Sequence, residues 1–389
     1  MSIMSNFGRL ISLLPMPNFS KHLNKTFPAK RLISLDALRG FIMFWIIGGQ
    51  IIIYSVNAAT GEKPLSWLAW QFTHQPWNGL NFYDLLFPMF MFISGVALVY
   101  SFDKHLSRGV KKNQLLLKAA GRCLILILLG IVYNNKFSFD FQNMRFYSVL
   151  GTIGVGYLIT SILYLYCGLR VRVIALVTIL LGTWALMTLI PVPGFGAGNL
   201  SPEGHFAGYI DRLLNFGKMY REHYDPEGVI NIISASTLTL AGSLAGTFLK
   251  NSKHKLAKNA ILLFVPGLIW LSISYIWNMF YPINKEMWTS SFSLAAISLS
   301  LIFLAIFYLI IDVWKLRFWS FPFVVIGLNS IAAYMANRMI DFEYTSEFIL
   351  TGLMKLSGEF SSLILATGVI ALEWFLLYLL YRKNIFLKI

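Results

Sequence analysis

Charged residues and cysteines are both scarce in this 389-residue chain. Asp, Glu, Lys and Arg together make up 13% of the sequence, which is about half of the share in an ordinary soluble domain. The chain therefore has no polar stretch from which a separate soluble domain of ordinary size could form. Its two cysteines, Cys123 and Cys167, both lie in apolar stretches. A disulfide framework is not indicated, and both are interpreted as small buried side chains.

The motifs of soluble enzymes are also missing. The sequence contains no phosphate-binding P-loop, no dinucleotide-binding glycine pattern, no HExxH zinc motif and no paired CxxC, and we expect no metal site. Its formal charge of +15 would indicate a nucleic-acid-binding surface in a soluble protein. Here the basic residues lie between apolar stretches, which is typical of cytoplasmic loops, so we expect no nucleic-acid partner.

Apolar residues dominate the chain, with 57% hydrophobic residues and a mean hydropathy of +0.65. A helix needs about 20 mainly apolar residues to cross a lipid bilayer. We predict an all-α fold, a polytopic integral membrane bundle of about ten transmembrane helices surrounded by lipid. The predicted spans cover residues 33–56, 80–102, 115–133, 146–167, 171–190, 228–249, 261–281, 292–313, 323–340 and 361–381.

The distribution of basic residues predicts that both termini are cytoplasmic. With that orientation, 20 of the 32 Lys and Arg residues fall in cytoplasmic connections or at the adjoining span ends and nine in or beside outer connections, the bias that membrane proteins show. The other three, Arg39, Lys118 and Arg122, lie within spans near their cytoplasmic ends. Residues 1–30 are expected to form a cytoplasmic leader, partly disordered or interfacial, and residues 31–389 a single transmembrane domain.

One of the six histidines stands out by its position. His74 lies in the first long outer connection, 57–79, shortly before a span that carries Asp84 near its outer end. A carboxylate can hold an imidazole in one tautomer and make it more basic, so the two residues are a candidate acid–base pair. The alternative is an ordinary loop histidine. The other five histidines, including His205 in the second long outer connection, 191–227, are interpreted as solvated.

Several ionisable and amide side chains fall inside the predicted spans. Such groups are costly in lipid and normally face a cavity or a partner. Asp36 and Arg39 lie three residues apart and could simply pair with each other on one helix face. Glu373, Asn329 and Asn337 lie deeper in their spans. For each of them, a satisfied contact between helices is an alternative to a role in a site.

Several blocks of sequence, in order along the chain, resemble the heparan-α-glucosaminide N-acetyltransferase family and its bacterial relatives. Together the blocks are more specific than any one of them, and the similarity covers nearly everything from residue 31 onward. The blocks are RLISLDALRG at 31–40, WNGL at 77–80 with DLLFPMFMFISG at 84–95, Arg145 with Val149-Leu150, YIDRLL at 209–214, YDPEG at 224–228, PINKEMWTS at 282–290 and GLNSI at 327–331.

The resemblance implies acetyl transfer across the bilayer, from acetyl-CoA in the cytosol to an amino sugar of the glucosamine type on the outer face. The protein would then be an acetyl-CoA-dependent N-acetyltransferase, expected in a bacterial cytoplasmic (inner) membrane. The active-site histidine of the family falls on His74, which the charge count independently places outside. An asparagine near the family's active site falls on Gln50, and the Gln-Arg pair that follows Val-Leu in the family is Gly151-Thr152 here, so these positions depart from the pattern.

The resemblance and the residues together predict the roles within the site. We expect His74 and Asp84 to be catalytic. His74 would either accept the proton of the acceptor amine or carry the acetyl group itself, and Asp84 would orient it. The expected ligands of acetyl-CoA are Arg39, Lys118, Arg122, Arg145 and Asn329. The expected ligands of the sugar are Gln50, Asn78, Asp225 and Glu227.

A sugar or solute permease is the alternative from another class. Ten helices with intramembrane charges suit alternating access equally well. A permease has no need of an outer histidine beside a route for acetyl-CoA, so His74 is the feature that separates the two hypotheses. A homodimer is a possible assembly.

Overall fold

The structure, a computed structural model, describes residues 32–61, 65–136, 140 and 143–387. The predicted leader, residues 1–30, lies outside these ranges. Within them every regular element is a helix, accompanied by two isolated β-bridges. Nine helices are long and apolar enough to cross a membrane, and a bent helix pair brings the number to ten when it counts as one span. The predicted fold class is therefore confirmed.

The elements are named here in chain order. They are α3 (Ile33–Phe44), the π-helix η1 (Trp45–Gly49), α4 (Gln50–Ala59), α5 (Ser66–Gln71), α6 (Phe82–Leu106), α7 (Lys112–Asn135), α8 (Val149–Tyr166), α9 (Leu169–Leu189), α10 (Phe206–Leu214), α11 (Val229–Asn251), α12 (Leu256–Asn278), α13 (Ser290–Phe307), the π-helix η2 (Tyr308–Val313), the 3-10 helix η3 (Phe318–Ser320), α14 (Phe321–Leu328), α15 (Ser330–Met339), α16 (Phe342–Leu356), the 3-10 helix η4 (Gly358–Phe360) and α17 (Ser361–Arg382).

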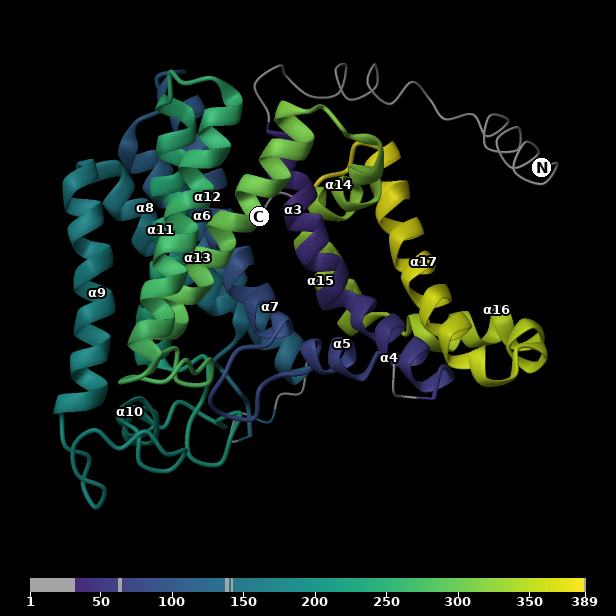
Figure 1. Cartoon of the computed structure of the whole chain (residues 1–389), viewed down its shortest axis with the longest axis horizontal. Helices are drawn as coiled ribbons and strands as arrows, with labels where there is room; N and C mark the ends of the chain where they lie inside the picture. Colours follow the sequence, from purple (N-terminus) through teal and green to yellow (C-terminus); the bar gives the residue numbers. More distant parts are fainter. Residues whose placement is uncertain (1–31, 62–64, 137–139, 141–142, 388–389) are drawn as a thin grey trace.

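The spans form two groups that stand side by side (Figure 1). The larger group contains α6 to α9 and α11 to α13, and α6 packs along α11 at its centre. The smaller group contains α3, α4 and α14 to α17. Aromatic side chains join the groups, because Phe41 of α3 contacts Phe82 of α6 and Phe303 of α13 with ring centroids 6.5 and 6.3 Å apart.

Glycines allow the central helices to touch backbone to backbone. A Cβ atom at Gly95 of α6 would lie 1.9 Å from the carbonyl oxygen of Thr239, and one at Gly242 of α11 would lie 1.9 Å from that of Phe92. No side chain fits at that distance. Small residues at helix crossings are the usual means of close packing in membranes, so these two positions require glycine.

Two of the predicted spans are interrupted. The first contains a π-helical turn in which Gly48 has φ of 138°, a conformation that glycine adopts without steric cost. The predicted ninth span, 323–340, corresponds to the helix pair α14 and α15, which meet at a 68° bend. Asn329 at the bend has φ of −126°. Its amide donates to Ile385 O at 3.0 Å and accepts from Leu387 N at 2.9 Å. The side chain thus binds the returning C-terminal segment.

Three shorter helices lie in the connections that the charge count assigns to the outer face. These helices, α5, α10 and α16, run along the lower edge of the molecule in Figure 1. None of these three helices was predicted from the sequence. The side chains of Tyr344, Phe348 and Leu353 on α16 are exposed. The orientation of the chain, with both termini cytoplasmic, stays a prediction from the charge bias.

Candidate active site

The loop between α5 and α6 is built around two buried side chains at the start of α6. The side chain of Asn81 donates from Nδ2 to the carbonyl of Thr73 at 3.1 Å, and its Oδ1 accepts from the side-chain Nε2 of Gln75 at 2.9 Å. Asp84, in the first turn of α6, accepts the backbone N–H groups of Gln75 and Asn81, both at 3.2 Å. A carboxylate satisfies the free N–H groups of a helix start in this way. These bonds fix the path of the loop that carries His74.

His74 and Asp84 form a direct pair. The Nδ1 atom of His74 lies 2.7 Å from Oδ1 of Asp84, and the His74 side chain is 50% exposed while that of Asp84 is 1% exposed. An ionised carboxylate only accepts hydrogen bonds, so Nδ1 carries the proton and Nε2 is the basic nitrogen. The structure brings the two side chains together as the sequence analysis expects, and their catalytic role stays a prediction.

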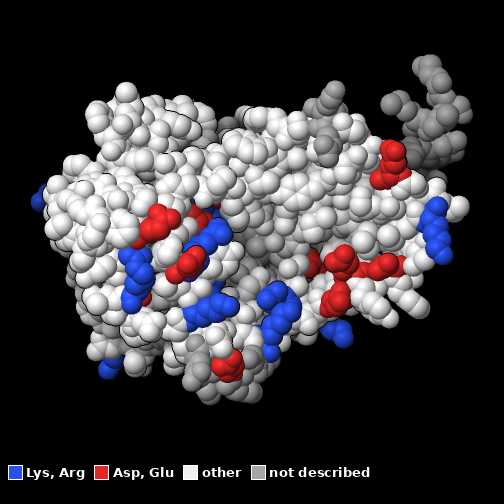
Figure 2. All heavy atoms as spheres, turned by 90° about the horizontal axis from the view of Figure 1, so that it is seen from below, with Lys and Arg blue, Asp and Glu red and all other residues white. Residues whose placement is uncertain are grey.

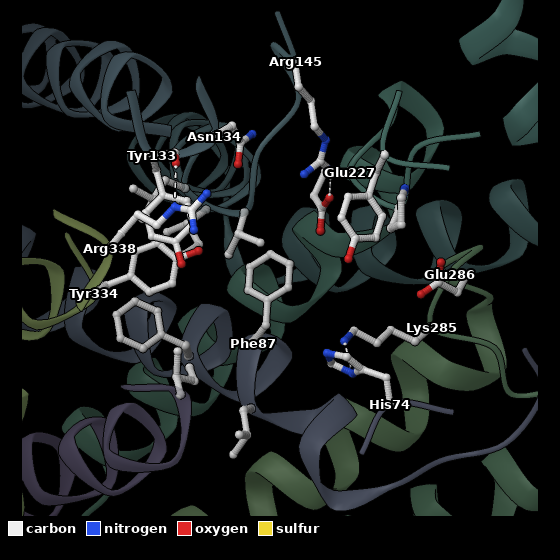
Figure 3. Close-up of a pocket in the computed structure, with 18 of the residues that line it drawn as sticks. His74, Phe87, Tyr133, Asn134, Arg145, Glu227, Lys285, Glu286, Tyr334 and Arg338 are labelled. Atoms are coloured by element: carbon white, nitrogen blue, oxygen red, sulfur yellow. Dashed lines mark hydrogen bonds and ion pairs between the residues drawn. The ribbon is translucent and has the colours of Figure 1, made fainter. Parts of the chain in front are cut away.

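A lysine joins this pair from the turn between α12 and α13. Nζ of Lys285 lies 3.4 Å from Oδ1 of Asp84 and 3.0 Å from Nδ1 of His74. Since Nδ1 donates its proton to Asp84, it has no lone pair left for the ammonium group. Lys285 therefore pairs with the carboxylate of Asp84. Its ammonium group lies beside the imidazole of His74 (Figure 3).

The turn that carries the lysine is anchored to the histidine loop. Nδ2 of Asn284 donates to Oδ1 of Asn78 at 3.1 Å, and the N–H of Gly79 donates to the carbonyl of Ile283 at 2.8 Å. Trp288 in the same turn has φ of 47°, and its side chain is 1% exposed. A non-glycine residue in this region costs about 1 to 2 kcal/mol, which the tight burial of the indole offsets. These two hydrogen bonds therefore fix the turn to the loop.

A cavity of about 700 Å³ lies beside these residues, within the range of small-molecule sites. It is bounded by both groups of helices and by the outer loops. Acidic and basic side chains are interleaved over part of this face of the molecule (Figure 2). The polar part of the lining includes His74, Asn143, Arg145, Lys218, Arg221, Glu227, Lys285, Glu286 and Arg338. The apolar part includes Met43, Ile46, Leu86, Phe87, Phe90, Val149, Leu150, Ile153 and Ile331.

Arg145 brings two predicted sugar ligands together. Its guanidinium donates to both carboxylate oxygens of Asp225, at 2.8 and 2.7 Å, and also pairs with Glu227. Although burial acts in the opposite direction, the two carboxylates hold the pKa of Arg145 above its usual value. Burial raises the pKa of Glu227 to about 7, against the opposing effect of Arg145. Glu227 lines the cavity, whereas Asp225 is fully buried behind Arg145 and does not.

An aromatic wall faces the histidine across the cavity (Figure 3). The rings of Tyr133 and Tyr334 are stacked, with centroids 4.4 Å apart and an angle of 12° between their planes. Arg338 lies over the Tyr133 ring, 5.7 Å from its centroid, and donates from Nε to the Tyr133 carbonyl at 3.3 Å. Stacked rings and a guanidinium offer a flat surface with a positive rim.

The other predicted sugar ligands lie outside the cavity lining. Asn78 is engaged with Asn284 and links two loops. Gln50 begins α4, and its buried Oε1 has no hydrogen-bond partner among the described residues. The structure thus brings Glu227 to the cavity but leaves Gln50 and Asn78 at other places.

Of the predicted ligands of acetyl-CoA, Arg145 lines the cavity and the others do not. Arg39 lies 3.6 Å from Asp36, which agrees with the pairing considered from their spacing. Lys118 is exposed on α7. Arg122 lies over the ring of Tyr157, 4.2 Å from its centroid.

The interpretation of His205 as a solvated histidine is wrong. The residue is fully buried at the start of α10, where Nδ1 accepts the N–H of Gly208 at 3.0 Å. Burial, assisted by Arg212, lowers the pKa of His205 to about 3, so it is neutral. The rings of Trp77 and Tyr224 pack against it at 5.8 and 5.0 Å. The second long connection therefore has a small core of its own.

The sequence analysis missed several residues of the cavity. Lys285 and Arg338 are two of the nine basic residues in or beside outer connections, where the topology disfavours them. A basic residue on the outer side could therefore have been singled out as a candidate site residue from the sequence. Lys285 also lies in the block at 282–290 that resembles the family. Tyr133 and Tyr334 gave no such signal, because aromatic residues are common at the ends of spans.

These observations define a class of protein, an integral membrane protein with a histidine–carboxylate pair beside a cavity at one face of its helix bundle. An imidazole oriented by a buried carboxylate stands beside a cavity of ligand size, which is the arrangement expected of a proton-transfer site. Within the described residues, no group of three or more His, Cys, Asp or Glu side chains could hold a metal ion.

Comparison with known proteins finds two similar curated proteins. No protein-family model matches the chain. The chain is 30% identical to the human heparan-alpha-glucosaminide N-acetyltransferase, over 92% of this chain and 60% of the human protein. It is 29% identical to the mouse protein of the same name, over 93% of this chain and 61% of the mouse protein. The two matches support membership in this family, and the chain spans about 60% of the length of these curated relatives.

Proposed function

We propose that the protein is a transmembrane N-acetyltransferase that transfers an acetyl group from cytosolic acetyl-CoA to an amino sugar on the outer face of a bacterial inner membrane. The observation that carries the proposal is the pair of His74 and Asp84 at the wall of the cavity. The names of the human and mouse relatives, which state N-acetyltransfer to a glucosaminide, support the reaction class.

The chemistry needs a base, and His74 has the geometry of one. An amine attacks the thioester carbonyl only after losing a proton, and Nε2 of His74 is the nitrogen left free to accept it. The C–N bond forms, the C–S bond breaks, and the thiolate of CoA leaves with the proton from His74. Asp84 stabilises the imidazolium that exists between these steps, because it lies 2.7 Å from Nδ1.

A second route uses the same residues. Nε2 of His74 would first attack the thioester and hold the acetyl group, and the amine would then take it. Acid quenching of the protein with labelled acetyl-CoA, without an acceptor, distinguishes the two routes. Label on the peptide that contains His74 indicates the covalent route. Direct transfer is indicated when this peptide carries no label although the same protein forms product once the acceptor is added.

Lys285 is placed to assist either route. The carbonyl oxygen of the acetyl group gains negative charge during the attack, and a fixed cation beside it lowers the barrier. The ammonium of Lys285 lies 3.0 Å from the imidazole, and its side chain is 18% exposed at the cavity wall. We assign it the role of stabilising this oxyanion.

The apolar part of the cavity fits the pantetheine arm of the donor. Ile153 of α8 lines the cavity, and Tyr157, one turn further along the same helix face, carries the guanidinium of Arg122. The buried Nε atom of Arg122 has no hydrogen-bond partner among the described residues. A phosphate of CoA would provide that partner. Arg39 and Lys118 remain proposed phosphate contacts nearer the cytoplasmic surface, and Asn329 a proposed contact of the donor.

The acceptor would occupy the polar part of the cavity. Glu227 and Glu286 offer carboxylates to the ammonium and hydroxyl groups of a sugar. Asp225 lies behind them and fixes Arg145, so its effect on the sugar is indirect. Gln50 and Asn78 would affect the acceptor only indirectly. Gln50 would act through the position of α4, and Asn78 through the turn that it binds at Asn284.

The test is acetyl transfer by the purified protein in detergent. With labelled acetyl-CoA and glucosamine, the wild-type protein should form N-acetylglucosamine, and His74→Ala should not. His254→Ala, at an exposed histidine on the opposite face, is the matched control and should retain the activity. Equal product from wild type and His74→Ala would refute the proposal.

One observation favours the permease alternative. The smaller group of helices contains two interrupted spans, one between α3 and α4 and one between α14 and α15. Interrupted helices are typical of secondary transporters. Under that hypothesis no amine is acetylated, and liposomes containing the protein take up a sugar. His74→Ala would then leave the uptake unchanged.

A further inference from the structure

Glu373 is an acidic side chain buried inside the last span, and the proposed reaction does not use it. The residue lies on α17 and is 3% exposed. Its Oε1 atom accepts a hydrogen bond from Nδ2 of Asn337 at 2.6 Å. Its buried Oε2 atom has no hydrogen-bond partner among the described residues. One carboxyl oxygen is therefore satisfied and the other is not.

Asn337 connects this carboxyl group to the break in the first span. The same Nδ2 atom donates to the backbone carbonyl of Ile47 at 2.8 Å. Ile47 lies in the π-helix η1, one residue before Gly48, whose φ of 138° interrupts the span. Asn337 itself belongs to α15, the second half of the bent helix pair. One amide group thus joins both interrupted spans to α17, and both of its N–H bonds are used.

No charged side chain of the described residues acts on Glu373. The elements that pack against α17 are η1, α4, α14, α15, α16 and η4, and η1 and α14 contain no ionisable residue. On α15, Arg338 and Tyr334 both contact Tyr133. On α4, the hydroxyl of Tyr54 donates to a backbone carbonyl. The ionisable residues of α16 and η4 are exposed, namely Glu343, Tyr344, Glu347, Lys355 and Glu359.

These surroundings suit a protonated carboxyl group. An ionised carboxylate in an apolar interior needs a paired cation or several hydrogen bonds, and here it would have one bond, from a neutral amide. Protonation removes the charge and makes Oε2 a donor, while Oε1 stays the acceptor that Asn337 requires. A metal ion is a poorer match, because the described residues contain no group of three or more His, Cys, Asp or Glu side chains that could hold one.

The carboxyl group also lies next to the wall of the first cavity. Ile46 and Arg338 line that cavity. Their neighbours in the chain, Ile47 and Asn337, form the contact between the two interrupted spans. A rearrangement of this contact therefore displaces two residues of the cavity wall.

We propose that Glu373 is an exchangeable proton-binding site inside the smaller group of helices. In its protonated form it holds Asn337, and through Asn337 the two interrupted spans, in the arrangement that forms the cavity wall. Loss of the proton leaves a buried charge, which favours separation of α17 from these spans and entry of water. The proposal does not rest on the N-acetyltransferase function, because it concerns the helices behind the cavity.

Infrared difference spectroscopy of the purified protein in detergent tests the proton directly. Spectra at about pH 6 and about pH 10, an interval in which buried glutamates titrate, should differ by carbonyl bands of protonated carboxyl groups that are lost at the higher pH. Glu373→Gln should lack one of these bands. Glu347→Gln, at an exposed glutamate on α16, is the matched control and should keep them all. Asn337→Leu removes the hydrogen bond to Oε1 and should shift the same band to higher frequency.

Two spectral results would overturn the proton site. The first is a difference spectrum that Glu373→Gln leaves unchanged or, if that variant does not fold, one that Asn337→Leu leaves unchanged. The second is a band that sodium suppresses at constant pH relative to choline, since sodium would then occupy the carboxylate.

Thermal unfolding tests the link between the proton and the helices. The Tm of Glu373→Gln relative to wild type should increase as pH rises, because the amide stays neutral while the wild-type carboxyl group becomes charged and loses its stabilising effect. A difference in Tm that stays constant with pH would overturn the role of the proton in holding the spans together.

Discussion

At the scale of single residues, the ring nitrogen of His74 that carries the proton determines which nitrogen can act as a base. Nδ1 is committed to Asp84, and Nε2 is free to act as a base. The sequence allowed the pair to be predicted, because His74 lies shortly before the predicted span that carries Asp84 near its outer end. It could not place Lys285, which reaches the pair from a turn about 200 residues away through the fold of two connections. The sequence also could not show that Asn78 binds Asn284 and so links the histidine loop to this turn, because that contact too joins residues about 200 positions apart.

Asp84→Asn should reduce acetyl transfer by about 10²- to 10⁴-fold, because an asparagine no longer stabilises the imidazolium or fixes its tautomer. The measurement is kcat at saturating acceptor, with thermal unfolding as the control for folding. The double variant with His74→Ala should be no slower than His74→Ala alone, since the two residues act as a unit. Additive losses would show that Asp84 works independently of the histidine.

Lys285→Met should lower kcat by about 10²- to 10³-fold, the usual loss when one oxyanion donor is removed. KM for the acceptor should change little, because the charge develops only in the transition state. Lys285→Arg keeps a cation and should recover part of the rate. A variant that raises only KM would mean that Lys285 binds the sugar and does not stabilise the oxyanion.

Asp211, a buried residue of α10, should make stability depend on pH. Burial raises its pKa from 3.8 to about 7, so the folded protein holds a proton that the unfolded chain has released. Its contribution is fully present below about pH 4 and is lost as pH rises to about 7. The Tm of Asp211→Asn relative to wild type should therefore increase over this range. A constant difference between the two proteins would contradict the assignment.

At the scale of elements, hydropathy predicted the spans because length and apolar content are local properties. The break at Asn329 was not predictable, since the side chain binds a segment more than 50 residues later. Helices α10 and α16 were missed because they are short and amphipathic. The burial of His205 in α10 depends on packing against Trp77 from another loop.

The glycines at the crossing of α6 and α11 give a test of the packing. Gly95→Ala should destabilise the protein by at least about 1 to 3 kcal/mol, the usual cost of overpacking, because its Cβ would lie 1.9 Å from a carbonyl oxygen. Gly121→Ala on α7, where a Cβ meets nothing within 4 Å, should be neutral or stabilising. Equal Tm values for the two variants would contradict the close approach.

At the scale of the whole molecule, the account requires that donor and acceptor meet from opposite sides of the membrane. The structure places the cavity and the histidine loop at one face, and the charge bias predicts that this face is the outer one. In sealed membranes, a cysteine at position 74 should then react with an impermeant reagent added from outside, and one at position 254 should not. The reverse pattern would invert the proposed direction.

The most direct measurement uses sealed proteoliposomes that contain the protein in one orientation, with labelled acetyl-CoA on the side of position 254 and glucosamine only on the side of position 74. The account predicts that labelled N-acetylglucosamine accumulates in the glucosamine compartment, and that His74→Ala abolishes it. Product that forms only when both substrates are on the same side would contradict transfer across the bilayer.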